Sequence, residues 1–230
     1  FYHVMKHIRN NTKLILIGDP DQLSSVGAGN VLHELIGSRV IPVTMLDTIY
    51  RQEGTSKIVT NSAKLNQGNG KFDYDDDFIF IESETQENVA DIILDVYQKE
   101  LNSGVSLDNV QILSPLKDRG ECSVCKINER ARELVNPKNP LTREIKVKNK
   151  IFRCGDKVLQ TKNNSDLGIS NGDLGIIIDI IVVDDVPVFM IDFGLKEIIE
   201  YSSTLVDNLM LAYATTIHKS QGSEYSTVIM

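Results

Sequence analysis

The sequence predicts an α/β protein that carries a small all-β module. Three observations support this fold class. Short apolar runs alternate with segments of helical periodicity over the first 145 residues, as in proteins built on a parallel sheet. After about residue 148 the helical periodicity ends and short β-branched runs follow one another, which is typical of a small barrel. The 230 residues, 41% of them apolar, are enough to bury a core of ordinary size.

The first part of the chain combines three apolar runs with two helical segments. Residues 13–17 form an apolar run that stops at Gly18, which suits a buried parallel strand followed by a turn. The other elements expected before residue 83 are a helix at 28–36 closed by Gly37, a strand at 41–45, a helix that begins at Thr55 or Ser56 and ends near Gly68, an acidic loop at 73–77 and a strand at 78–81.

The middle part predicts a helix, a strand and a second helix. Ser83 and Gln86 have the spacing of a capping box. One apolar helical face follows, made of Val89, Ile92, Ile93, Val96, Tyr97 and Leu101. The next two elements are a strand at 110–114 stopped by Pro115 and a helix at 124–134 that ends before Pro137.

The all-β module is predicted from short strands and one turn signal. The dipeptide Asn171-Gly172 is typical of a tight turn between antiparallel strands. The expected strands lie at 157–161, 174–183, 186–192 and 198–201.

Composition and charge exclude several protein classes. The net charge of −8 argues against a polybasic nucleic-acid binder, although a locally basic channel stays possible. The stretch from Lys117 to Lys150 is where charge favours a polyanion, unless it is a solvated helix face. Three cysteines exclude a disulfide framework and fit a reducing cytoplasm, where we expect the protein. No apolar run is long enough to span a membrane.

The ends of the chain and its cysteines carry little functional information. The chain starts at Phe1 without an initiator Met or a signal-peptide layout, so we expect it to be a piece of a longer protein. Neither Cys122-x-x-Cys125 nor the acidic run 75–77 has the spacing of a metal site, and no metal ion is expected at either.

The segment after the first apolar run offers polar groups for chemistry. At the carboxyl end of a buried strand, where open α/β sheets bind ligands, Gly18 permits a tight turn and Asp19 can act on a cation or its waters. Gln22 can bond a phosphate oxygen or an attacking water. On these residues alone, a plain strand-to-helix turn capped by Asp19 is an equally good interpretation.

Five motifs in register resemble one helicase family. The pattern Gly-Asp-x-x-Gln-Leu-x-x-Val-Gly-x-Gly at 18–29 resembles motif III of superfamily 1 DNA helicases, in the form of the RecD-like branch. That branch includes RecD, its stand-alone relatives and the helicase part of TraA-type relaxases. The other matches are Tyr-Arg-Gln at 50–52 as motif IV, Leu-Ser-Pro at 113–115 followed by Asn128, the segments 155–164 and 171–175 of an SH3-like insert, and 214–225 as motif V.

The resemblance implies a fold and a division of the chain. The expected fold is a RecA-like, P-loop NTPase-type parallel-sheet domain, the second motor domain of the enzyme, with an inserted small SH3-like β-barrel. The implied parts are the end of the first RecA-like domain at 1–37, the second RecA-like domain at 38–147 and 208–230, and the barrel at 148–207.

The resemblance also assigns site residues. Gln22 and Arg51 are the expected catalytic residues, because a guanidinium can neutralise charge on a terminal phosphate. The residues expected to bind nucleotide are Asp19, Gln22, Arg51, Gly222 and Glu224. The residues expected to bind nucleic acid are Pro115, Asn128, Lys157, Asn163, Thr216, His218 and Lys219. Residues 151–208 hold 4 basic and 10 acidic side chains, so DNA contact by the barrel and a purely structural insert stay equally open.

The implied function is ATP-dependent movement on single-stranded DNA, in the 5′-to-3′ direction, in recombination or repair, with ATP and Mg²⁺ as cofactors. No Gly-x-x-x-x-Gly-Lys-[Ser/Thr] pattern occurs, so these residues alone are expected to bind no nucleotide tightly and to hydrolyse no ATP. The expected partners are single-stranded DNA, a first RecA-like domain of the same protein and nuclease–helicase subunits, with no membrane. Two alternatives stay open: a non-catalytic DNA-binding or subunit-interface module of a nuclease–helicase complex, and the helicase part of a conjugative relaxase.

Overall fold

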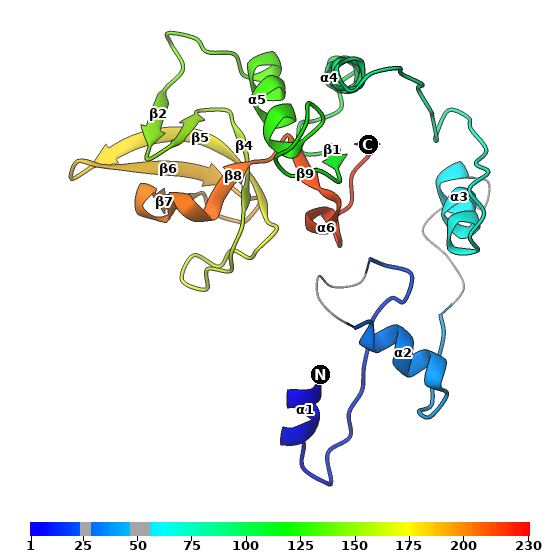
Figure 1. Ribbon diagram of the computed structural model, residues 1–230. Coiled ribbons are helices and arrows are strands. Elements are labelled where there is room, and N and C mark those ends of the chain that lie inside the picture. The colour runs from blue at the N-terminus through cyan, green and yellow to red at the C-terminus, as the bar shows by residue number, and fades with distance from the viewer. Residues whose placement is uncertain (24–28, 47–55) are drawn as a thin grey trace. The chain divides into compact units, whose positions relative to one another are not determined.

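The computed structural model describes residues 1–23, 29–46 and 56–230, and it divides the chain into two units (Figure 1). Unit 1 is Phe1–Glu82 and unit 2 is Ser83–Met230. We describe each unit by itself. Among the helices in the described ranges, none has the length and apolar character that a bilayer crossing requires.

Unit 1 contains three helices and, in its described part, no strand longer than a single bridge. The helices are α1 Tyr2–His7, α2 Val31–Ser38 and α3 Lys57–Asn66. The predicted strands at 13–17, 41–45 and 78–81 are therefore wrong for this structure, and their apolar side chains are exposed, as Ile17 at 94% and Ile79 at 71% show. A strand needs a hydrogen-bonded neighbour, and the described residues of unit 1 supply only the bridge between Asp75 and Phe78.

The two longer helices of unit 1 end close to their predicted positions. Helix α2 ends at Ser38, and Arg39 rather than Gly37 is the C-cap, in a left-handed conformation with φ of 57°. Helix α3 begins after Ser56 as expected, but its first backbone N–H donates to a distant group. The amide of Lys57 donates to both carboxylate oxygens of Asp77, at 3.1 and 3.0 Å. The acidic loop therefore supplies the anion that a helix N-terminus favours.

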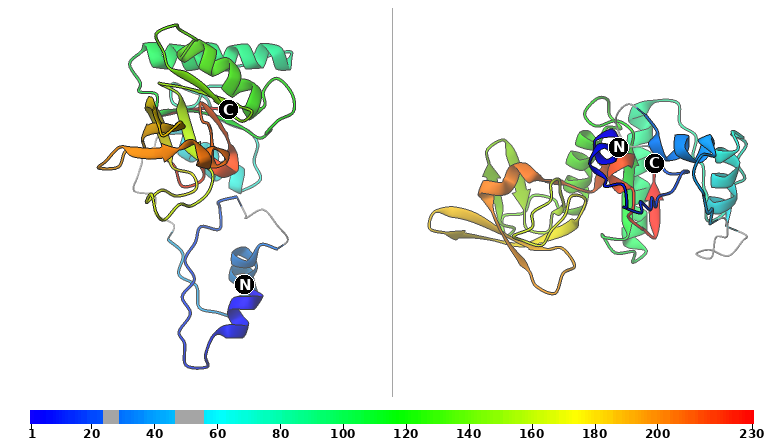
Figure 2. Two further views of the ribbon diagram at one scale, coloured as in Figure 1. Left: turned by 90° about the vertical axis from the view of Figure 1, so that its left-hand side faces the viewer. Right: turned by 90° about the horizontal axis from the view of Figure 1, so that it is seen from below.

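Unit 2 contains a parallel sheet covered by two helices. The strands are β1 Val110–Ser114, β9 Ala214–Thr216 and β10 Thr227–Ile229, in the order β10-β1-β9. Helices α4 Gln86–Asn102 and α5 Val124–Val135 lie side by side against this sheet (Figures 1 and 2). The apolar core between them is formed by Ala90, Ile93, Leu94, Tyr97, Val110, Ile112, Ile127, Ala131, Tyr213 and Ala214. The predicted strand and both predicted helices of this region are confirmed.

The N-cap of helix α4 lies two residues later than the capping-box pattern predicts. The side chain of Thr85 accepts a hydrogen bond from the amide of Asn88 at 3.2 Å, so Thr85 and not Ser83 is the N-cap.

An antiparallel sheet lies in the sequence between β1 and β9. Its order is β7-β6-β5-β4-β8, and a two-stranded sheet, β2-β3, accompanies it. The bounds are β2 Glu144–Val147, β3 Lys150–Arg153, β4 Lys157–Gln160, β5 Leu174–Val183, β6 Val186–Asp192, β7 Ile199–Ser202 and β8 Leu209–Leu211, with the 3-10 helix η1 Ser203–Asn208 before β8. The strands predicted after residue 157 are confirmed, whereas β2 and β3 were not predicted.

The antiparallel sheet has an apolar core of its own. It is formed by Phe152, Val158, Ile169, Ile177, Ile180, Phe189, Ile191, Tyr201, Val206 and Leu209. The long β5–β6 hairpin turns at Asp184 and Asp185, both with positive φ, as a two-residue hairpin turn of the primed type requires. Unit 2 therefore holds two apolar cores, one for each sheet.

Candidate nucleic-acid interface

The carboxyl ends of two neighbouring strands bring several predicted DNA-binding residues together. In the parallel pair β1–β9, Ser114 is opposite Thr216. Pro115 therefore leaves β1 beside the start of α6 Ile217–Ser220, the short helix that follows β9 (Figure 1). His218 and Lys219 lie in that helix. Because open α/β sheets bind ligands at the carboxyl ends of their strands, this edge is the candidate interface.

The candidate interface carries positive charge. His218 is exposed, and Lys219 is half-buried with its ammonium group 3.3 Å from the sulfur of Met210. Burial lowers the pKa of Lys219, and the nearby ammonium of Lys117 lowers it further. Two cations held near each other are a favourable site for a phosphate group, since a bound anion would relieve their repulsion. The sequence marks Lys117 as the start of a basic stretch and does not predict that it lies near Lys219.

The loop after β1 is held in place from within. The hydroxyl of Ser114 donates to the carbonyl of Cys122 at 2.7 Å and accepts from the amide of Leu116 at 3.1 Å. The amide of Val124, the first residue of α5, donates to the carbonyl of Leu116 at 2.8 Å. These bonds fix the short segment that positions Pro115 and Lys117 at the sheet edge.

Asn128 is placed inside the fold rather than on the interface. Its side chain is 4% exposed, and both ends of its amide are bonded to β9. The amide nitrogen donates to the carbonyl of Ala214 at 2.9 Å, and the amide oxygen accepts from the N–H of the same residue at 2.9 Å. In this structure Asn128 offers no polar atom to DNA, and its role is to hold β9 against α5.

The expectation that Lys157 binds DNA is also wrong for this structure. The side chain is fully buried, and its ammonium donates to the carbonyls of Leu107 and Val110 and to the side-chain oxygen of Gln111. A strand pattern alone does not reveal on which face a lysine lies when both faces are covered. Lys157 therefore does not reach a DNA strand in this structure.

Asn163 lies in a folded loop between β4 and β5. Its side chain is exposed, and its amide oxygen accepts the N–H of Asn171 at 2.8 Å. The neighbouring Asn164 accepts from the amides of Asp166 and Leu167, so its side chain builds the turn. Contact between Asn163 and DNA stays a prediction. The hydrogen bond from Asn171 also gives Asn163 a structural role in the loop.

The predicted nucleotide-binding residues are divided between the two units. In unit 1, the side chain of Gln22 donates to the carboxylate of Asp19 at 3.1 Å, and both residues are exposed. In unit 2, Gly222 has φ of 82° and Glu224 is exposed after α6. Arg51 lies outside the described residues. The structure therefore brings Asp19 and Gln22 together.

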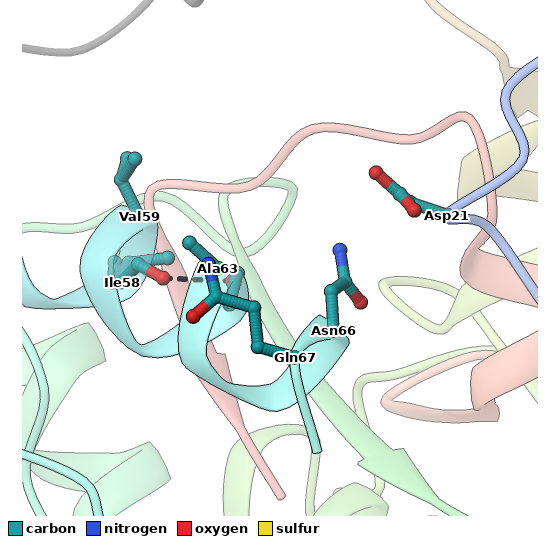
Figure 3. A pocket seen from close by; sticks show the side chains of 7 residues that line it. Asp21, Ile58, Val59, Ala63, Asn66 and Gln67 are labelled. Carbon is teal, nitrogen blue, oxygen red and sulfur yellow. Dashed lines mark hydrogen bonds between the residues drawn. The ribbon is translucent and has the colours of Figure 1, made fainter. Parts of the chain in front are cut away.

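A surface pocket of about 490 Å³ lies in unit 1 along α3 (Figure 3). The described residues that line it are Asp21, Ile58, Val59, Ser62, Ala63, Asn66 and Gln67. They include a carboxylate and no cation, so this lining does not favour a phosphate group.

The cysteines and acidic residues form no metal centre in the described structure. Cys122, Cys125 and Cys154 form no disulfide bond within the described structure, and burial raises the pKa of Cys122 and of Cys154. Raised pKa values make these two thiols poor nucleophiles. Within 1–23, 29–46 and 56–230, no three His, Cys, Asp or Glu side chains are arranged to hold a metal ion.

Comparisons with known proteins agree with the motifs. The family described as "ATP-dependent RecD-like DNA helicase SH3 domain" matches residues 127–193, and the family described as "AAA domain" matches residues 1–84. The ATP-dependent RecD2 DNA helicase of Deinococcus radiodurans is 30% identical over 94% of this chain and 28% of its own length.

Two further relatives extend the comparison. Conjugal transfer protein TraA of Agrobacterium fabrum is 25% identical over 96% of this chain and 20% of its own length. The RecBCD enzyme subunit RecD of Mycolicibacterium smegmatis is 24% identical over 98% of this chain and 41% of its own length. The chain thus spans less than half of each of these relatives. Over nearly all of its length, the chain is similar in sequence to RecD-like DNA helicases, as the motifs predicted.

Proposed function

We propose that these residues are part of an ATP-dependent DNA helicase or translocase that acts on single-stranded DNA. The observation that carries the proposal is the carboxyl edge of β1 and β9, where Pro115, Thr216, His218 and Lys219 come together. Hydroxyl and cationic donors at such an edge suit a phosphodiester backbone, which is bound mainly by charge and hydrogen bonds. The relationship to RecD-like helicases supports the same function.

We propose the domain division that the motifs imply. Residues 1–37 are the end of a first RecA-like domain, residues 38–147 and 208–230 belong to the second, and residues 148–207 are the SH3-like barrel. The exposed apolar residues of unit 1, such as Leu14 and Ile15, support this division, because they fit the strand of a sheet whose other strands lie elsewhere in a longer protein. The rest of that first motor domain is the proposed partner of residues 1–37.

We propose that the intact protein uses ATP and Mg²⁺ as cofactors. Asp19 and Gln22 fit this role, because a carboxylate and an amide held 3.1 Å apart can bond metal-bound waters and a phosphate oxygen. When bound, the nucleotide supplies the free energy of phosphate hydrolysis. Arg51 would neutralise charge on the terminal phosphate, and Gly222 and Glu224 would contact the nucleotide from the second domain. The proposed movement is 5′ to 3′, in recombination or repair.

Salt-dependent DNA binding tests the proposal. In the intact protein, Lys219→Ala should weaken single-stranded DNA binding. The slope of the logarithm of the binding constant against the logarithm of the salt concentration should fall by about the value of one phosphate contact. Lys99→Ala removes an equal charge from the exposed face of α4 and is the matched control. Fluorescence anisotropy over a range of salt concentrations measures both. Equal slopes for the two variants and the wild type would remove the β1–β9 edge from the DNA path.

ATP hydrolysis separates the motor from its alternatives. Arg51→Ala should abolish DNA-stimulated ATP hydrolysis while DNA binding persists. A wild-type protein that binds DNA and hydrolyses no ATP would instead be a passive DNA-binding or subunit-interface module. A nicking activity in the same protein would identify a conjugative relaxase.

A further inference from the structure

One buried polar cluster lies where the chain passes between the two sheets of unit 2. We call this cluster the joint, and it consists of Gln111, Asn136, Asp156, Lys157 and Tyr213. The chain leaves α5 at Asn136 on its way to the antiparallel sheet. It returns through residues 212–213, which connect β8 directly to β9. Both connections therefore contribute a side chain to the joint.

The side chain of Lys157 extends from one sheet of unit 2 to the other. Its backbone belongs to β4 of the antiparallel sheet, and its ammonium lies at the start of β1 in the parallel sheet. The ammonium donates to the carbonyls of Leu107 and Val110 at 2.8 and 3.1 Å and to the side-chain oxygen of Gln111 at 3.1 Å. Three donors thus meet three acceptors that diverge from one point, which fixes direction as well as distance.

Gln111 and Lys157 hold the return connection from both sides. The side-chain nitrogen of Gln111 lies 3.2 Å from the carbonyls of both Ala212 and Tyr213, to which it donates. The carbonyl of Lys157 accepts the amide of Ala212 at 2.9 Å. A polar side chain inside an otherwise apolar strand is the sequence signal that marks Gln111.

Asp156 ties the return connection to the outgoing one. Its carboxylate is fully buried and accepts the hydroxyl of Tyr213 at 3.0 Å and the side-chain amide of Asn136 at 2.9 Å. The backbone amide of Arg153 donates to its other oxygen at 2.8 Å. Burial raises the pKa of Asp156 and lowers that of Lys157 to about 8.

We propose that Lys157 is a positioning residue that fixes the antiparallel sheet on the parallel sheet, so that both move as one body. An apolar contact between the sheets would resist separation but would tolerate sliding, because hydrophobic contact has no direction. Divergent hydrogen bonds from a buried group resist both. The barrel then keeps one orientation relative to the edge that carries Thr216, His218 and Lys219. The importance of this orientation for DNA binding rests on the proposed function, whereas the fixed position of the two sheets does not.

Hydrogen exchange in the intact protein tests the joint directly. Lys157→Met keeps the length of the side chain and removes its donors. The amides of residues 212–214 should then exchange on the order of tenfold faster, while those in α4 and in the β5–β6 hairpin keep their wild-type rates. Lys146→Met makes the same change at an exposed position of β2 and should leave all of these rates unchanged. Unchanged exchange at 212–214, or an equal acceleration throughout unit 2, overturns the proposal.

A milder pair of variants keeps the test decisive if Lys157→Met does not fold. Tyr213→Phe removes one hydroxyl from the joint. Tyr97→Phe removes a buried hydroxyl that has no hydrogen-bond partner within the described structure, and it is the matched control. Faster exchange at 212–214 in Tyr213→Phe alone supports the joint. The same response in both variants contradicts it.

The functional consequence is measured separately. In the intact protein, Lys157→Met should retain DNA-stimulated ATP hydrolysis and consume more ATP for each base pair unwound. A wild-type protein without DNA binding would refute the proposed function, while the exchange experiment would still decide the joint. Wild-type ATP consumption per base pair in a Lys157→Met protein whose exchange has changed would show that the joint does not serve the motor.

Discussion

Units 1 and 2 belong to one chain, but each unit is stabilised internally by different interactions. In the described part of unit 1, Asn61 is the one buried residue, and its amide exchanges two hydrogen bonds with the backbone of Asp73. The ammonium of Lys64 adds an ion pair to the side chain of Asp73 at 2.7 Å. Unit 2 instead buries two apolar clusters, one beneath each of its larger sheets. Unit 1 is ordered by polar contacts and by aromatic contacts among Phe72, Tyr74, Phe78 and Phe80, whereas unit 2 is ordered by buried apolar cores.

The difference teaches which sequence signals are local. The backbone hydrogen bonds of a helix lie within the helix itself, so α3 forms even where no core covers it. Its cap is not local, because Ser56 makes no capping bond with its side chain and the amide of Lys57 donates to Asp77. An apolar run becomes a strand only beside another strand, because its N–H and C=O groups need partners outside the run. The runs at 13–17 and 110–114 look alike in sequence, yet only the second has neighbours in the described structure, β9 and β10.

The largest predicted effect compares one substitution in both units. Ile112→Ala opens a cavity in the centre of the parallel sheet and should cost about 2–5 kcal/mol of unfolding free energy. Ile17→Ala removes the same atoms from a side chain that is 94% exposed, and should change stability by less than about 0.5 kcal/mol. Urea denaturation of the 230-residue chain measures both. A large cost for Ile17→Ala would mean that unit 1 buries this side chain in solution.

The second prediction concerns the buried charge of the joint. Lys157 has a pKa of about 8 in the folded chain, below its ordinary value of about 10.4. Between these two values the unfolded chain holds a proton that the folded chain lacks, so stability should rise with pH, by about 1 kcal/mol per pH unit at most. Lys157→Met should remove this rise between pH 8 and 9.5.

Denaturation at several pH values, with Lys146→Met as the control, measures this slope. The pKa of Lys150 is also lowered by burial, so part of a rise is expected in every variant. What identifies Lys157 is the difference between the wild type and Lys157→Met. Parallel pH profiles for the two would show that the Lys157 ammonium is not buried in solution.

Much of unit 2 could be predicted from the sequence, because its signals agree with its contacts. Residues 110–114 form β1 as predicted, since an apolar run there meets two parallel neighbours. The strands at 174–183 and 186–192 also match, because β-branched runs flank a two-residue turn. The hairpin of β2 and β3 was missed because its lysine-rich sequence resembles a solvated face.

The candidate site was predictable in part. The motifs marked Pro115 and Thr216 as residues expected to bind DNA, and the register of β1 and β9, with Ser114 opposite Thr216, brings both to one edge of the sheet. Burial was not predictable from the motifs. Asn128 and Lys157 carry groups that could bind a phosphate, but each is turned inward to satisfy backbone groups of a neighbouring strand. Only the three-dimensional contacts distinguish a polar residue that binds a ligand from one that holds the fold.

A third prediction separates the observed helix cap from the predicted one. Thr85→Ala removes the acceptor of the Asn88 amide and should destabilise unit 2 by about 1 kcal/mol. Ser83→Ala removes a hydroxyl that does not cap α4, so it should have little effect. Thermal unfolding of both variants measures the difference. Equal destabilisation would restore the capping-box assignment at Ser83.

The smallest predicted effect lies in unit 1, at the start of α3. Hydrogen bonds from the side chain of Ser56 and from the amides of Lys57 and Ile58 hold the pKa of Asp77 below its ordinary value. A lowered pKa stabilises the folded form above the ordinary value, and this support is lost as the pH falls below about 4. Asp77→Ala should therefore speed the exchange of the Lys57 amide at neutral pH, and in the wild type acid should do the same.

Asp76→Ala is the matched control, since it removes a neighbouring carboxylate from the same turn. Amide exchange by NMR resolves the first turn of α3 in each variant. If Asp77→Ala and Asp76→Ala behave alike, general negative charge near the helix N-terminus suffices, and the specific bond to Lys57 adds nothing. If only Asp77→Ala loosens the turn, a single carboxylate from the acidic loop orders α3. That contact then adds to the hydrogen bonds and the ion pair that Asp73 makes with Asn61 and Lys64 of the same helix.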